Sequence, residues 1–212
     1  DNVENMPSAR VGMTSTLTIN SPRGNAISYE SSQGMMAGHI ATALNGELSN
    51  EGLRVRASNF VELYEVPTEQ IQFDLKGDNA ETVSIDYDMS VGSISAFVAA
   101  INAHTDETGI IAYSSANNRN IVLQKIDGND ISIENVAIAN EGEIKLRQLD
   151  SFGEVINSPE NTTPQTISTG KFASIGGQIT FVSSTNFSLS YNGVENSSQT
   201  SKFEAGFVTK DY

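Results

Sequence analysis

The chain has 212 residues, with 26 acidic against 12 basic side chains and a formal net charge of −14 at pH 7. This negative field repels phosphate backbones and anionic lipid surfaces, so the composition argues against nucleic acid or a membrane as a partner. Cysteine is absent, which excludes disulfides and thiolate metal sites. No apolar run approaches the roughly 20 residues that cross a bilayer. The length suffices for one or two domains with cores of their own.

Two strands, a helix and a further strand are predicted in the first third of the chain. Residues 14–20 alternate polar and apolar side chains, residues 21–25 hold the Pro and Gly of a turn, and residues 26–30 form the second strand. Extended chain resumes at Gly52 and continues to Tyr64. Between these strands, the apolar residues of one helical face are Met36, Ile40, Ala43, Leu44 and Leu48.

The same order of elements follows in the next stretch. Strands are predicted at residues 71–75 and 83–87, where polar and apolar residues again alternate. A helix is predicted at Ile94–Asn102, because its apolar residues follow helical spacing and either Ser90 or Ser93 can cap its start. A polar run then reverses the chain into another extended segment.

These two stretches match as copies of one unit. The segment Ile40–Asn45 aligns with Phe97–Asn102 position for position, and a glycine follows each at the same distance, Gly52 and Gly109. The leading strands align after a one-residue gap. A repeat of about 57 residues is long for a solenoid and fits a small duplicated α+β unit, which we predict to be ββαββ.

The rest of the chain is predicted to be mostly strands. Turn residues at 117–120, 127–130 and 192–193 separate alternating segments, and residues 157–165 hold two prolines and are predicted to be a loop. We therefore predict an α+β fold, mainly antiparallel β with two short helices. The predicted domains are a first ββαββ repeat at 13–66, a second at 69–150 with an extra hairpin, and a C-terminal β segment at 166–212 that either stands alone or completes one of the others.

Few residues could carry out chemistry. The two histidines, His39 and His104, lie in or just after the predicted helices, and no spacing joins them into a catalytic or metal-binding pattern. Asp86 and Asp88 share one strand face and could serve as the acid and base of a glycosidase. The same alternation fits an ordinary solvated face, and no aromatic platform flanks it. We favour the solvated face.

Other polar residues have structural interpretations. Asp127, Asn129 and Asp130 could offer oxygens to Ca²⁺, but the run lacks the spacing and distal Glu of a calcium loop and predicts a plain hairpin turn. Asn45 and Asn102 are expected to close their helices, since asparagine tolerates left-handed geometry. We assign no catalytic, cofactor-binding or metal-binding residues, and we predict a protein that is not an enzyme and uses no cofactor.

Neither the glycines nor the N-glycosylation patterns of the sequence indicate a functional site. Gly24, Gly34 and Gly92 form no phosphate-binding motif, since no Lys or Ser/Thr signature accompanies them. The acceptor pattern for N-linked sugars is short and common, and we expect Ser or Thr hydroxyls in exposed loops to be better attachment sites. That pattern occurs at Asn161, Asn186 and Asn196.

A family resemblance lies in the second copy. Residues 97–113 followed by residues 120–133 resemble the Ile-Asn motif of bacterial flagellins and flagellar hook-associated proteins. The first copy resembles the motif at fewer positions, and the segment that begins at Gln178 is similar to a flagellin outer-domain hairpin. The matching positions of the second copy are Ile101, Asn102, Thr108, Gly109, Ala112, Leu123, Asp127 and Gly128. Those of the first copy are Leu44, Asn45, Gly52 and Leu63.

The resemblance implies the surface-exposed outer domains of a flagellin, a structural protein of the flagellar filament that serves motility outside the cell. The chain begins without Met and lacks long amphipathic termini, so we expect an excised internal fragment or a processed product. Its expected partners are other flagellin subunits, through terminal helices absent from this fragment, with surface glycans as further candidates. Two alternatives stay open. One is a carbohydrate-binding or adhesin module of a hook-associated or filament-cap protein, and the other is an acidic secreted glycan hydrolase.

Overall fold

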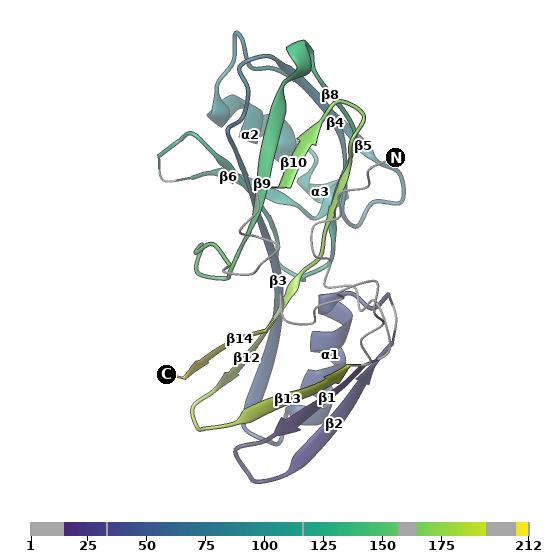
Figure 1. Cartoon of the computed structure of the whole chain (residues 1–212), viewed down its shortest axis with the longest axis vertical. Helices are drawn as coiled ribbons and strands as arrows, with labels where there is room; N and C mark the ends of the chain where they lie inside the picture. The colour runs from purple at the N-terminus through teal and green to yellow at the C-terminus, as the bar shows by residue number, and fades with distance from the viewer. Residues whose placement is uncertain (1–14, 33, 116, 157–164, 194–206, 212) are drawn as a thin grey trace.

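The structure is a computed structural model that describes residues 15–32, 34–115, 117–156, 165–193 and 207–211. The molecule is elongated and has two lobes, one above the other in Figure 1. The fold is α+β and mainly antiparallel, as predicted. One long strand, β3 (Leu53–Tyr64), runs through both lobes. The described residues form three short helices where two were predicted, because α3 (Thr105–Thr108) adds a single turn after the second predicted helix.

The first lobe contains both ends of the described chain. Its strands β13, β1 and β2 form one antiparallel sheet. The first half of β3 pairs antiparallel with β12, and β14 adds to β12 in parallel. Helix α1 packs with these strands around a core that includes Leu17, Ile40, Leu44 and Phe181. The bounds are β1 (Ser15–Asn20), β2 (Ala26–Ser31), α1 (Ala37–Leu48), β12 (Gln178–Ser183), β13 (Ser188–Gly193) and β14 (Phe207–Asp211).

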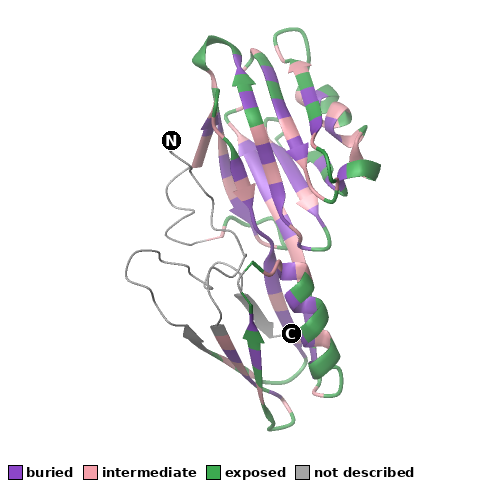
Figure 2. Ribbon diagram, turned by 90° about the vertical axis from the view of Figure 1, so that its right-hand side faces the viewer, coloured by how far each residue is buried: buried purple, intermediate pink, exposed green. Residues whose placement is uncertain are grey.

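The second lobe comprises residues 59–177 and has a larger core. The sheet β11-β8-β4-β5 faces the sheet β10-β9-β3-β7-β6. Side chains between them include Phe73, Phe97, Ile101 and Leu123, and buried and exposed residues alternate along the strands in Figure 2. The bounds are β4 (Gln70–Lys76), β5 (Val83–Asp88), α2 (Ile94–Asn102), β6 (Ile111–Ser114), β7 (Ile121–Lys125), β8 (Ile131–Ile138), the 3₁₀ turn Ala139–Glu141, β9 (Glu143–Leu149), β10 (Gln165–Ser168) and β11 (Ala173–Ile175).

The two longer helices each bury one stripe of side chains. Ser93 caps α2, since its hydroxyl oxygen accepts a hydrogen bond from the Ala96 amide at 3.2 Å. On α1 the buried residues are Ala37, Ile40, Ala41, Leu44 and Leu48. The prediction that Ala43 faces the core was wrong, because Ala43 is exposed. The stripe is centred on the side of the helix that carries Ala37 and Ala41.

Both lobes are built from the same six elements in the same order. The first uses β1-β2-α1-β3-β12-β13, and the second uses β4-β5-α2-β6-β7-β8. In each, the last strand pairs antiparallel with the first. Leu17 pairs with Tyr29 in the first lobe, and the equivalent pair in the second lobe is Phe73 and Ile85. Relative to the alignment of the two helices, the strand pairs are shifted by one residue, which is the predicted one-residue gap. The repeated unit is therefore ββαβββ, one strand longer than the predicted unit.

The second copy is inserted into the first. In the first lobe, the third and fourth strands are halves of a hairpin whose connection is the whole second lobe. Ser58 and Gln178 pair directly, so the chain leaves the first lobe and returns to it at one point. The ranges 13–66, 69–150 and 166–212 stay a prediction of domains. Strand pairing adds that the last range contributes β12 and β13 to the first lobe and β10 and β11 to the second.

Candidate functional site

An asparagine clamp joins each helix to the strand that follows it. In the first lobe, the Asn45 Nδ2 donates to the Val55 carbonyl at 2.6 Å, and the Val55 amide donates to the Asn45 Oδ1 at 2.8 Å. In the second lobe, Asn102 makes the same two bonds with Ala112, at 2.8 and 2.7 Å. Each clamp spans ten residues. The asparagine of the Ile-Asn motif thus has one role in both copies.

The prediction that these asparagines close their helices was wrong for Asn45; Asn102 is the last residue of α2, but it does not have the expected left-handed geometry. Asn45 lies inside α1, and α2 continues into a right-handed cap at Ala103 after Asn102. The left-handed residues are the two glycines that turn the chain, Gly52 with φ 78° and Gly109 with φ 67°. The asparagine amide instead carries the donor and acceptor that an edge strand leaves open, and it satisfies both groups of one residue.

The lobes meet where the turn at residues 127–130 packs against the first lobe. A Cβ on Gly128 would overlap the Ala57 side chain, and one on Gly38, in the first turn of α1, would overlap the Asp127 carbonyl oxygen. A Cβ on Gly177 would overlap the carbonyl of Gly128. Backbone therefore contacts backbone at this junction, which leaves no room for side chains and little room for rotation between the lobes.

Three buried amide side chains complete the junction. Asn59, fully buried, donates from Nδ2 to the carbonyls of Ile175 at 2.7 Å and Asn129 at 3.1 Å. The Gln148 Nε2 donates to the Gly176 carbonyl at 2.6 Å, and the Gln178 Nε2 donates to the Leu149 carbonyl at 2.7 Å. These carbonyls lie where the strands of the two lobes part, so the amides replace ladder bonds that the sheets cannot supply. Each such bond contributes about 1 kcal/mol net.

A buried lysine holds the junction turn from the second lobe. Lys125, 1% exposed, places its Nζ 2.6 Å from the Asp78 Oδ2 and 2.9 Å from the Asp127 Oδ2. A buried charge of this kind is stable only when it is paired. Lys125 was not predicted as a site residue. The sequence feature that could have identified it is its position two residues after Leu123, which places its side chain on the inward face of β7.

The suggested calcium oxygens are engaged in this turn. Asp127 accepts from Lys125 and also from the Asn129 amide at 2.9 Å. Within the residues that the structure describes, no group of three or more His, Asp or Glu side chains could hold a metal ion. Residues 127–130 form a turn, as predicted, but not a hairpin, because the strands before and after it, β7 and β8, belong to different sheets. The turn also contacts the first lobe.

The two histidines lie in different lobes, whereas Asp86 and Asp88 share the exposed face of β5. His39 is exposed on α1, whereas His104 lies in the other lobe with its Nδ1 3.2 Å from the Glu107 Oε1. Asp86 accepts from Gln70 at 2.7 Å. Hydrogen bonds from the Ser90 hydroxyl, and then from its amide, lower the pKa of Asp88. A glycosidase acid needs a raised pKa, so Asp88 is shifted in the opposite direction.

The remaining predicted positions are structural or exposed. Gly24 and Gly34 have open space around them, and Gly92 packs beneath the Tyr87 ring. Asn186 is exposed. Asn161 and Asn196 lie outside the described residues.

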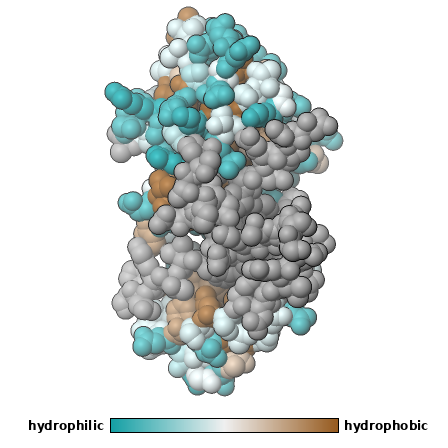
Figure 3. All heavy atoms as spheres, in the orientation of Figure 1, coloured by the Kyte–Doolittle hydropathy of each residue, from teal (hydrophilic) through white to brown (hydrophobic). Residues whose placement is uncertain are grey.

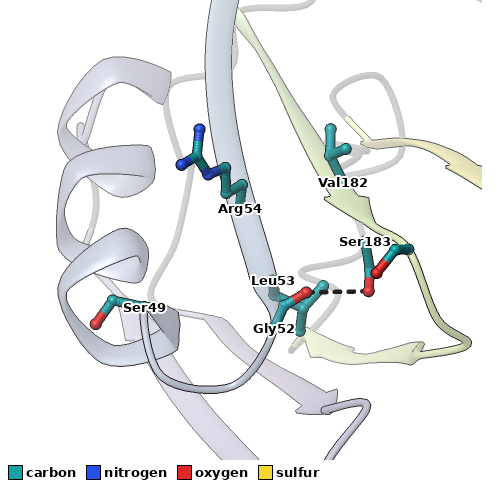
Figure 4. A pocket seen from close by; sticks show the side chains of 7 residues that line it. Ser49, Gly52, Leu53, Arg54, Val182 and Ser183 are labelled. Atoms are coloured by element: carbon teal, nitrogen blue, oxygen red, sulfur yellow. Dashed lines mark hydrogen bonds between the residues drawn. The ribbon is translucent and has the colours of Figure 1, made fainter.

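A shallow depression in the first lobe is shown in Figure 4. It has a volume of about 370 Å³ and opens widely to solvent. Its lining includes Leu53, Arg54 and Val182, and the Ser183 hydroxyl donates to the Gly52 carbonyl at 3.0 Å. Ligand sites of this size normally enclose most of their ligand, so we assign no ligand to this depression.

The surface is mostly polar. In the view of Figure 3, hydrophobic residues of the described chain form small patches among hydrophilic ones. Among the described residues, no helix has both the length and the apolar character needed to cross a membrane.

Comparisons with known proteins assign no family to the chain. No protein-family model matches the chain, and no curated protein matches it. Among solved structures, the chain is similar to the flagellar cap protein FliD from Helicobacter pylori, with a TM-score of 0.27 and 9% sequence identity. The match covers 63% of this chain and 51% of that one, so the chain spans about half the length of the cap protein. A likeness this distant assigns neither a family nor a function.

Proposed function

We propose that this chain forms a pair of outer domains of a bacterial flagellin, displayed on the flagellar filament outside the cell, where it serves motility. The observation that carries the proposal is the repeated asparagine clamp. The motif that resembles the flagellin family includes Asn102, and its equivalent in the first copy, Asn45, makes the same pair of bonds. The motif therefore has a physical role, to tie a helix to an edge strand.

The way in which the two lobes are joined supports a structural role. An outer domain on a rotating filament must keep its shape under drag. β3 is continuous through both lobes, and the junction adds close backbone contact and buried amide bonds. A connection of this kind resists bending better than a flexible linker, in which few contacts cross between domains. The net charge of −14 favours solubility and keeps neighbouring surfaces apart.

The proposed role involves no reaction, cofactor or metal. The proposed partners are other flagellin subunits, through the long terminal helices that build the filament in the family that the motif resembles.

Immunogold electron microscopy of the cells that produce this chain tests the proposal. Antibodies raised against residues 15–193 should label extracellular filaments along their whole length. Label at the filament tip alone would instead favour the second candidate, a module of a filament-cap protein. Label on the cell body without filaments would contradict both functions.

The second candidate is a carbohydrate-binding or adhesin module of a hook-associated or cap protein. The observation that favours it is an exposed sheet face in the second lobe with aromatic side chains. The composition of that face leads to a more specific inference.

A further inference from the structure

The sheet β10-β9-β3-β7-β6 turns one face to the core and the other outward. Val61, Leu63 and Leu123 point into the core, so the residues next to them in the strands point outward. We call the outward residues of β6, β7, β3 and β9 the outer face. Strand register places its residues in rows. One row is Ile111, Gln124, Phe60, Leu149 and Val155; the next is Tyr113, Val122, Glu62 and Arg147; the third includes Tyr64 and Lys145.

The outer face is unusually apolar for a chain of this charge. Ile111 is 40% exposed, Tyr113 is 39% exposed and Val155 is 44% exposed. Phe60 is half-buried beside them, whereas Val122, Leu149 and Glu62 in the same rows are buried, so the exposed apolar side chains lie mainly at the two edges of the face. Burial raises the pKa of Tyr113, and its neutral hydroxyl can donate a hydrogen bond.

The duplicated unit provides an internal comparison. The clamp partners Val55 and Ala112 are equivalent, so Ile111 and Tyr113 occupy the positions of Arg54 and Arg56 in the first lobe. Both arginines are exposed. The same edge strand is thus charged in one copy and apolar and aromatic in the other. Because exposed charges are the usual protection of an edge strand, their replacement on the second copy indicates that this face contacts a partner.

Fixed polar groups lie among the apolar residues. The Glu62 carboxylate accepts from the Asn120 Nδ2 at 2.8 Å and from the Arg147 Nε. The Arg147 guanidinium lies over the Tyr64 ring, 4.7 Å from its centre. These contacts hold the planar guanidinium flat on the face, and its side chain remains 34% exposed. A guanidinium has five N–H donors, so the face offers donors to a bound molecule at a fixed position.

Size and charge restrict the partner. Five positions across the strands and three rows along them span roughly 19 by 14 Å at ordinary strand spacings, which is on the order of 300–400 Å² with the side chains included. A stable protein dimer buries about 800 Å² on each partner. A second copy would also bring the same net charge of −14. Anionic polymers meet the same repulsion.

We propose that the outer face binds a neutral carbohydrate chain. Sugar rings have apolar faces that pack on Tyr113 and Phe60, and they carry hydroxyls that pair with Arg147 and Gln124. Glu62 and Tyr64 lie beneath and hold the Arg147 guanidinium in place. Apolar and aromatic side chains with a few fixed polar groups also line the pockets that bind small ligands. The outer face offers these groups on a sheet surface, so a bound chain would keep one side in solvent. This binding role is independent of the proposed place of the chain in a filament.

Native gel electrophoresis in gels that contain a neutral polysaccharide tests the proposal. The probes are yeast mannan, laminarin and hydroxyethyl cellulose, with heparin as an anionic comparison, and mobility is measured relative to a gel without polysaccharide. We expect the whole chain to be retarded by at least one neutral probe and not by heparin. The double variant Ile111→Arg, Tyr113→Arg carries the residues of the first lobe at the equivalent positions, and we expect its affinity to fall at least tenfold.

The reciprocal variant Arg54→Ile, Arg56→Tyr is the matched control and should bind as the natural chain does. Far-ultraviolet circular dichroism and thermal melting show whether each variant folds. If the double Arg variant melts early, Tyr113→Ser replaces it and should lose binding as well. Retardation by heparin alone, equal retardation of the folded variant, or no retardation by any neutral probe would overturn the proposal. A concentration-dependent dimer in sedimentation that the variant abolishes would also overturn it, because the face would then bind a second copy.

Discussion

The two lobes are copies of one module that differ in how the chain passes through them. The second lobe is formed by one continuous segment, whereas the first is closed by strands from the far end of the chain. Both keep the clamp and the left-handed glycine after it. The comparison teaches that the helix, its asparagine and its glycine define the module, and that the connection between the third and fourth strands is free to vary. An insertion is tolerated there because the two strand ends lie side by side.

Two glycines of the second lobe, one at the junction with the first lobe and one away from it, differ in what surrounds them, and this difference gives the largest expected effect. Gly128 and Gly153 both have positive φ, 72° and 81°. A Cβ on Gly128 would overlap Ala57 across the junction, whereas Gly153 has open space. We expect Gly128→Ala to cost about 3 kcal/mol or more, because steric overlap adds to the left-handed strain. The control Gly153→Ala should cost only about 1–2 kcal/mol.

Urea denaturation followed by circular dichroism measures both variants. Equal losses of unfolding free energy in the two variants would show that the junction accommodates a side chain at residue 128. The account of two lobes held by backbone contact would then be wrong.

The clamps test whether the two copies are equivalent. Asn45→Ala and Asn102→Ala each remove two hydrogen bonds to a strand backbone. We expect each substitution to cost about 2 kcal/mol, at about 1 kcal/mol for each bond. Hydrogen exchange of the Val55 and Ala112 amides should accelerate in the matching variant only. A large effect in one lobe and none in the other would break the comparison.

The smallest effect concerns two surface carboxylates, one in each lobe. Hydrogen bonds from Ser21, and then from Asn25, lower the pKa of Glu51, and bonds from Ser90 lower that of Asp88. A lowered folded-state pKa gives stability that is present above the unfolded value and is lost as pH falls through the folded one. Both contributions therefore disappear as the pH falls below about 4.

Substitution of the hydroxyl donors checks this. Ser21→Ala should raise the pKa of Glu51 and leave that of Asp88 unchanged, and Ser90→Ala should do the reverse. A carboxyl-detected NMR titration measures both groups in one sample. An unchanged pKa in either variant would mean that the serine hydroxyl is not the cause of the shift.

Local features of the fold could be predicted from sequence because they depend on nearby residues. The spacing of Ile40, Leu44 and Leu48 predicted α1, and the match to Phe97 and Ile101 predicted its repeat. The insertion could not be predicted, since the pairing of β3 with β12 joins segments that are far apart in the chain. No short-range pattern encodes such a pairing.

The candidate site was predicted only in part. The asparagines of the two copies were identified, but their bonds to Val55 and Ala112 require the strand to be in place. Asn59, Gln148 and Gln178 are buried amides at the junction. In sequence they look like ordinary polar residues of exposed strand faces, because their burial arises only where one lobe enters the other.

The most direct test of the account is removal of the second lobe. Residues 59–177 are replaced by an Asn-Gly turn, which joins Ser58 to Gln178 as a two-residue hairpin. We predict a folded first lobe that unfolds cooperatively in urea, with the Val55 amide still protected from hydrogen exchange by Asn45. A chain that remains unfolded, or one in which Val55 exchanges freely, would contradict the claim that one complete module is inserted into another.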